Sequence, residues 1–96
     1  MMEIKIEHEH DGKRGSFFVQ NGGERLAEMV YVKAGSQKMI IEHTEVDDSL
    51  KGEGIGLKLL MELVDFVRKE NIKVIPLCPF AKAMFQKKEE LRDVLN

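Results

Sequence analysis

Apolar and polar residues alternate with a period of two through the first half of the chain, which is typical of half-buried strands. In the first such run, Ile4 and Ile6 fall on one face and the charged residues beside them fall on the other. The alternation predicts four strands, over residues 2–8, 16–20, 24–33 and 38–46. The apolar residues of the third run do not alternate cleanly, so we expect a bend or a bulge there. Turn-forming residues between the runs, such as Asn21-Gly22-Gly23, predict hairpin connections.

The period changes to that of a helix after residue 56. Apolar positions then recur at helical spacing, at Leu59, Leu60, Leu63, Val64 and Val67. This spacing predicts an amphipathic helix from Leu57 to about Lys69, with Asn71 suited to its end. We expect a fifth strand over residues 72–75, followed by short helices over residues 80–87 and 89–95.

The order of these elements predicts the fold class. A helix between two strands has the length of a right-handed crossover, so strands 38–46 and 72–75 should lie side by side and parallel. Pro76 has no N–H for a ladder, and we therefore expect this pair to splay; the alternative is a proline that only ends an edge strand. The prediction is one α+β domain over residues 1–96, with a mixed, mostly antiparallel five-stranded sheet in the order ββββαβα.

Composition narrows the class of function. The chain has 96 residues, 43% of them hydrophobic, and a net charge of −2 with acidic and basic residues interspersed, which argues against a binder of duplex nucleic acid. No apolar run approaches the roughly 20 residues of a membrane span. A single cysteine cannot form an internal disulfide, which favours a reducing compartment. We expect a cytoplasmic monomer without nucleic-acid or membrane partners.

A glycine-rich segment, Lys51-Gly52-Glu53-Gly54-Ile55-Gly56, joins the fourth strand to the helix. Such a turn presents backbone N–H groups at the positive end of the helix dipole, where they favour an anion. Glycine allows close approach of a phosphate and positive φ angles. The segment therefore indicates a phosphorylated ligand, with a purely structural turn as the alternative. Its glycine spacing matches neither the P-loop nor the dinucleotide-binding fingerprint.

The pattern basic-x-x-Gly-x-Gly after an antiparallel strand resembles the pyrophosphate loop of the GNAT (GCN5-related N-acetyltransferase) family, which holds acetyl-coenzyme A. That loop usually begins with Arg or Gln, where this chain has Lys51. The resemblance covers residues 38–87. Three segments together are similar to those of a small subgroup of stand-alone domains, namely His43-Thr44, the glycine-rich segment and Cys78-Pro79-Phe80-Ala81.

The resemblance implies a site for acetyl-coenzyme A or coenzyme A. The N–H groups of residues 52–57 would hold the pyrophosphate, and the pantetheine arm would thread the gap between the splayed strands. The residues implied at this site are Thr44, Glu45, Val46, Lys51, Gly52, Glu53, Gly54, Ile55, Gly56, Leu57, Lys58 and, at the adenosine end, Lys82. We expect no metal site, because His8 and His10 lack further ligands nearby in the sequence.

Transfer of an acetyl group to an amine requires a base for the amine proton. Strand alternation places Ile41, His43 and Glu45 on one face of the fourth strand, and Glu42 and Thr44 on the other. His43 is the best candidate base, since an unperturbed histidine has a pKa of about 6.5. Glu42 and Glu45 are alternative bases. His43 could instead have only a structural role, as a histidine hydrogen-bonded within a half-buried sheet.

The departing thiolate needs a proton, and here the chain departs from the family. GNAT enzymes typically carry a tyrosine in the helix after the fifth strand, four residues beyond a small residue, and the corresponding residue after Ala81 is Phe85. The only tyrosine, Tyr31, lies on another strand. Cys78, near a predicted helix N-terminus, is the candidate acid or acyl carrier. Alternatively, Cys78 serves only as a small, buried, apolar side chain.

The family normally places one or two helices between its first two strands, where they form a wall of the acceptor site. Residues 10–15 are too few for them. Three functions follow: an acetyl-coenzyme A-dependent N-acetyltransferase acting on an unidentified amine, on a small molecule or a protein; a coenzyme A-binding module without catalysis; and an interaction domain that keeps only the fold.

Overall fold

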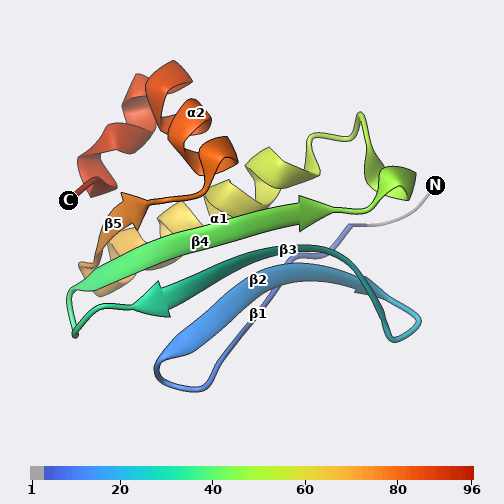
Figure 1. Cartoon of the computed structure of the whole chain (residues 1–96), viewed down its shortest axis with the longest axis horizontal. Coiled ribbons are helices and arrows are strands. Elements are labelled where there is room, and N and C mark those ends of the chain that lie inside the picture. The colour runs from blue at the N-terminus through green and yellow to red at the C-terminus, as the bar shows by residue number, and fades with distance from the viewer. Residues whose placement is uncertain (1–3) are drawn as a thin grey trace.

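Five strands form one sheet in the order β1-β2-β3-β4-β5 (Figure 1), in a computed structural model that describes residues 4–96. The strands are β1 (Glu7–His10), β2 (Arg14–Asn21), β3 (Glu24–Lys33), β4 (Lys38–Val46) and β5 (Lys73–Pro76). The helical elements are η1 (Asp48–Leu50), α1 (Ile55–Glu70), α2 (Pro79–Lys87) and η2 (Glu89–Val94). The first four strands pair antiparallel and β5 pairs parallel with β4, which confirms the predicted mixed α+β sheet.

The first two strands differ from their predicted bounds. Residues 4–6 lie outside the ladder, which stops where Glu7 pairs with Phe18, next to a bulge in the β2–β3 pair that increases the local twist. Predicted strand residues 2 and 3 lie outside the described residues. β2 begins at Arg14 because Asp11 accepts the N–H groups of Lys13 and Arg14 and closes a tighter turn than expected.

The expected irregularity of the third strand is confirmed. Val19 pairs with Ala27 and Gln20 pairs with Arg25, which leaves Leu26 unpaired as a β-bulge. The bulge restores the alternation beyond it, so that Ala27, Met29 and Tyr31 all face the buried side.

The helical elements also begin and end slightly away from their predicted bounds. α1 begins at Ile55, two residues early, because the Gly54 carbonyl already accepts the Lys58 N–H. Asn71 ends α1 in the left-handed region, at φ 57°. The last element is a 3-10 helix ending at Val94, because Leu91 and Val94 are both buried and the three-residue period keeps them on one side.

The core lies between the sheet and α1, which crosses one face of the strands (Figure 1). The residues predicted to face the core from α1 are all fully buried, namely Leu59, Leu60, Leu63, Val64 and Val67. Ala81 and Phe85 of α2 and Leu91 and Val94 of η2 complete this core beside β4 and β5. No helix within residues 4–96 is long and apolar enough to cross a membrane.

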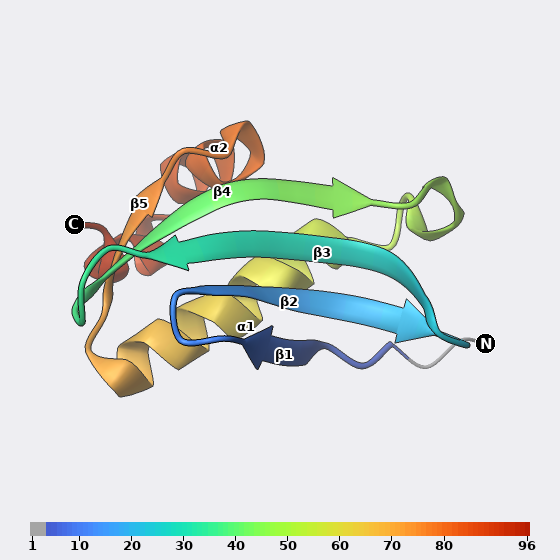
Figure 2. The same ribbon diagram turned by 60° about the horizontal axis from the view of Figure 1, so that its bottom comes forward.

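The opposite face of β1–β4 carries no covering helix in the described part of the chain (Figure 2). Phe18 is nevertheless buried, because the Arg25 guanidinium lies 3.9 Å from the centroid of its ring. The same guanidinium donates to Ser16 Oγ at 3.2 Å and to Glu9 Oε1 at 2.6 Å. One arginine thus covers part of this otherwise open face.

Candidate functional site

The parallel pair of β4 and β5 opens part-way along its length. The register ends where Ile41 pairs with Pro76, and the Ile41 carbonyl accepts the N–H groups of Leu77 and Cys78 at 3.0 and 3.1 Å. The chain then turns into α2, while β4 continues to Val46 (Figure 1). Pro76 has no N–H to extend the ladder, so the last residues of β4 lose their neighbour on this side. The splayed pair expected from the sequence is present.

A second β-bulge lies at the opening. Tyr31 pairs with Ile41 and Val30 pairs with His43, which leaves Glu42 unpaired. The inserted residue reverses the alternation beyond it: Ile41 is fully buried, His43 is exposed and Thr44 is half-buried. The prediction that Ile41, His43 and Glu45 share a face was therefore wrong for Ile41.

The open edge of β4 carries backbone groups that lack a strand partner on that side. The Asp47 N–H donates to the Leu26 carbonyl at 2.7 Å, on the β3 side of the strand. N–H groups alternate in direction along a strand, so those of Thr44 and Val46 point to the open edge and that of Glu45 points to β3. Thr44 and Val46 can therefore bond an amide of an extended ligand lying in the opening.

The glycine-rich segment forms the turn that leads into α1. Gly52 and Gly54 have φ angles of 83° and 68°, and a Cβ on either would meet no heavy atom within 4 Å. Gly54 is the N-cap of α1, and no side chain caps this end of the helix. The N–H groups of the first helical residues, 55–57, lie N-terminal to the first intrahelical bond, so they are free to bind an anion. The Glu53 N–H differs, because it donates to the Leu50 carbonyl at 3.3 Å.

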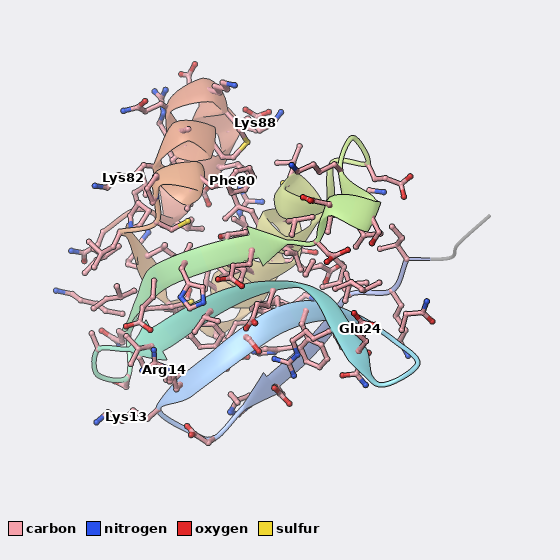
Figure 3. The ribbon with its side chains drawn as sticks, turned by 45° about the vertical axis from the view of Figure 1, so that its right-hand side comes forward. Lys13, Arg14, Glu24, Phe80, Lys82 and Lys88 are labelled. Carbon is pink, nitrogen blue, oxygen red and sulfur yellow. The ribbon has the colours of Figure 1, made fainter. Side chains whose placement is uncertain are left out.

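The charged side chains of this turn extend into solvent. Lys51 Nζ lies 3.1 Å from Asp48 Oδ1, with side-chain exposures of 74% and 88%, so this pair contributes at most about 1 kcal/mol and can exchange for a ligand phosphate. Glu53 and Lys58 are also exposed. Lys82 lies apart from the turn, since it lines a hollow with Phe85 and Arg92 on the side of α2 away from Phe80 (Figure 3).

Phe80 joins the two helix N-termini. A Cβ on Gly56 would lie 2.7 Å from Phe80 Cζ, so the ring packs directly against the first turn of α1. α2 begins at Pro79, and the first turns of both helices therefore meet beside the opening. This contact was not predicted from the sequence. Its signal was Gly56 itself, because a glycine within a helix costs about 1 kcal/mol relative to alanine.

Cys78 lies at the N-cap position of α2 and is 2% exposed. Its Sγ atom is 3.3 Å from Thr44 Oγ1, a contact that bridges β4 and α2 across the opening. This geometry suits a small buried residue, and it also places a thiol at the opening.

The structure separates the two candidate catalytic residues. Thr44 and Cys78 lie on the helix side of β4, whereas His43, the residue before Thr44 in the strand, projects from the uncovered face. Of the alternative bases, Glu42 forms an ion pair with Arg14, and Glu45 lies opposite Glu28 on β3. No group of three or more His, Cys, Asp or Glu residues within residues 4–96 is placed to hold a metal ion.

Comparison with known proteins identifies the family. A sequence model described as GCN5-related N-acetyl-transferase matches residues 16–94. The chain belongs to this family. Protein NATD1 of Xenopus tropicalis is 38% identical over 74 residues, which cover 76% of this chain and 68% of the relative. Protein NATD1 of Homo sapiens is 36% identical over 74 residues, 76% of this chain and 66% of the relative.

Solved structures of GNAT proteins share the fold. A GCN5-like putative N-acetyltransferase from Staphylococcus aureus is 32% identical and superposes with a TM-score of 0.74, over 100% of this chain and 91% of that protein. A GNAT family acetyltransferase from Elizabethkingia anophelis with acetyl-CoA bound superposes with a TM-score of 0.61, over 81% of this chain and 54% of that protein. Its identity is 13%, so this second likeness concerns the fold alone.

Proposed function

We propose that the protein is an acetyl-coenzyme A-dependent N-acetyltransferase whose cofactor binds in the opening between β4 and α2. The observation that carries this proposal is the divergence of β4 from β5 beside the uncapped, glycine-rich N-terminus of α1. Membership of the GNAT family supports it, as does the fold shared with a family member that binds acetyl-CoA.

Two sets of backbone groups fit the two ends of this cofactor. The N–H groups of Ile55, Gly56 and Leu57 would bind the pyrophosphate, with the α1 dipole adding to the attraction. The edge groups of Thr44 and Val46 would bond the amides of the pantetheine arm, as a neighbouring strand would. The bound cofactor supplies an activated acetyl thioester.

The proton transfers would then take place on opposite sides of β4. Acetyl transfer forms a bond from the amine nitrogen to the acetyl carbon and breaks the bond from that carbon to sulfur. His43, on the uncovered face, would accept the proton that the amine loses. Cys78, on the helix side, would donate a proton to the departing thiolate. The amine acceptor would therefore approach from the uncovered face, and the leaving group would receive its proton on the side of α2.

Turnover of acetyl-coenzyme A with a broad panel of amines tests this proposal. Replacement of His43 with glutamine should lower kcat by about 100-fold or more, because glutamine cannot accept the proton that the amine loses. Cys78→Ala should lower kcat with little change in KM, because the Cys78 thiol is proposed to protonate the leaving group and not to bind the substrate. Turnover no greater than in buffer with every amine, or an unchanged kcat for His43→Gln, would contradict the assignment.

A second function, cofactor binding without catalysis, has one observation in its favour. Phe85, at the position where the family typically carries a tyrosine, is 3% exposed and offers no proton. Saturable binding without turnover would favour this function. A cytoplasmic monomer remains our proposal for the state of the protein, and sedimentation at several protein concentrations tests the monomer.

A further inference from the structure

The uncovered face of the sheet presents an ordered array of side chains. The strand register sets one row across β1 to β4, consisting of Glu7, Phe18, Glu28 and Glu45. It sets a second row beside the first, consisting of Glu9, Ser16, Val30 and His43. His43, the candidate base, is thus a member of this array and not separate from it.

Acidic groups predominate on this face. Five carboxylates project from it, those of Glu7, Glu9, Glu28, Glu42 and Glu45. Two guanidinium groups, from Arg14 and Arg25, project among them. Lys38 lies on the same side of β4 as Ile40, so three basic side chains of these strands face five carboxylates. A long-range attraction for cations follows from such a distribution.

Two of these carboxylates repel each other in the folded protein when no ligand is bound. Glu28 and Glu45 lie directly opposite each other on β3 and β4, and like charges in such a position destabilise a sheet. Within residues 4–96, Glu28 forms an ion pair with Arg25, at 3.9 Å, and that guanidinium is already shared with Glu9 and Ser16. A cation bound over the pair would relieve the repulsion.

The shape of the face favours an extended ligand. One hollow, of about 160 Å³, is lined by Arg25, Glu28, Glu45 and Asp47 among others. A second, of about 340 Å³, lies toward the β1–β2 turn and includes Asp11, Arg14 and Val30. The two hollows lie toward opposite ends of the strands, which Glu24 and Arg14 mark in Figure 3. A compact molecule cannot fill both, whereas a peptide can span them.

Apolar side chains lie beside the carboxylates. Val30, Val32 and Ile40 lie on this face by the strand register and are half-buried. In the described part of the chain no helix covers these strands on this side (Figure 2). A partner that combines basic and apolar side chains would match both features, because it would bury the apolar residues and neutralise the carboxylates.

We propose that this uncovered face, with Glu7, Glu28 and Val30 at its centre, docks a basic peptide segment of another protein. A lysine side chain or an N-terminal amine of that segment would lie at His43, which makes the segment the acceptor. The acetylation of the segment rests on the function proposed above, whereas its docking does not.

Binding of a synthetic peptide to the isotope-labelled protein tests the docking directly. The probe is an extended peptide of alternating lysine and valine residues, and its control replaces each lysine with glutamine. Saturable amide shifts at Val30, Val32 and His43 are expected with the lysine peptide alone, and the affinity should fall as the salt concentration rises. Equal shifts with the glutamine peptide would overturn the proposal.

A pair of charge reversals locates the surface. Glu7→Lys combined with Glu28→Lys should weaken peptide binding by about tenfold, as expected for two or more exposed charge pairs. The matched control combines Glu62→Lys with Glu70→Lys, both exposed on α1 on the other side of the sheet, and should leave the affinity unchanged. If the first variant does not fold, Glu7→Lys alone serves, with Glu62→Lys as its control. Equal losses in both variants would overturn the proposal.

The outcomes separate this inference from the proposed function. Peptide shifts on the face without acetylation of the peptide in the presence of acetyl-coenzyme A would support docking and contradict the acceptor role. Cofactor shifts at residues 55–57 without peptide shifts on the face would refute the docking surface alone. Equally tight binding of spermidine would replace the peptide with a small polyamine and overturn our choice of partner.

Discussion

Gly54 provides a test in which stability and cofactor binding respond differently. It is the N-cap of α1, at φ 68° and ψ 28°, and a Cβ on it would contact no other atom. Gly54→Ala therefore adds no clash, and its cost is the strain of an L-residue in the left-handed region, about 1–2 kcal/mol in the free energy of unfolding. For a domain of this size, each kcal/mol lowers Tm by about 4–8 °C. Gly54→Asn should cost less, because asparagine tolerates this region and suits an N-cap.

Cofactor affinity should follow another order. Both variants place atoms beside the free N–H groups of the first turn of α1, where the pyrophosphate is proposed to lie. Loss of one charge-assisted hydrogen bond is worth about 1.5–3 kcal/mol, which corresponds to about 10- to 100-fold in Kd. Gly54→Asn should thus keep most of the stability and lose much of the affinity for coenzyme A.

Gly35 supplies the matched control. It has a φ of 88° and equally open surroundings, and it lies in the turn between β3 and β4, at the far end of β4 from the N-terminus of α1 (Figure 1). Gly35→Ala should show the same strain cost in urea denaturation and an unchanged Kd in calorimetry. Binding of coenzyme A by Gly54→Asn as tight as that of the wild type, or an equal loss of affinity in Gly35→Ala, would refute a phosphate site at the N-terminus of α1.

Three further predictions concern other parts of the fold. Gly15→Ala should lower the free energy of unfolding by about 2 kcal/mol or more, measured by urea denaturation, because its Cβ would lie 2.5 Å from Tyr31 Oη and 2.8 Å from a backbone oxygen. Burial, followed by the charge of His10, lowers the pKa of His8, whose Nε2 lies 2.6 Å from Tyr31 Oη. The stability from this group should be complete above about pH 6.5 and be lost as the pH falls through the lower folded pKa, and urea denaturation from pH 7.5 to 5 measures this. Cys78 should react with a thiol reagent slowly in the native protein and rapidly in urea, and fast native labelling would contradict its burial.

The succession of strands along the chain and the buried face of α1 could be predicted from the sequence, because each depends on a local period of apolar residues. Leu59 and Leu63 face the core wherever the helix packs. The side of β4 from which His43 projects could not be predicted. It depends on the bulge at Glu42, and a one-residue slip in register is set by how Tyr31 and Ile41 pack in the core.

The predicted cofactor site likewise has one part that local sequence determines and another that depends on packing. The glycine-rich turn and the splayed strands depend on Gly54 and Pro76, whose backbone preferences can be read from the sequence. Lys82 was assigned to the adenosine end by resemblance, and the rotation of α2 about its axis decides where that side chain points. That rotation follows from the burial of Ala81 and Phe85, which sequence spacing alone did not fix.

The most direct test of the account is an NMR titration of isotope-labelled protein with acetyl-coenzyme A, following backbone amide shifts. We predict large, saturable shifts at Ile55, Gly56 and Leu57, with a second group at Thr44 and Val46 on the open edge of β4. The Gly35 amide, remote from the opening, should not move. A titration without shifts at millimolar cofactor, or shifts spread evenly over the sheet, would contradict a cofactor site between β4 and the two helix N-termini.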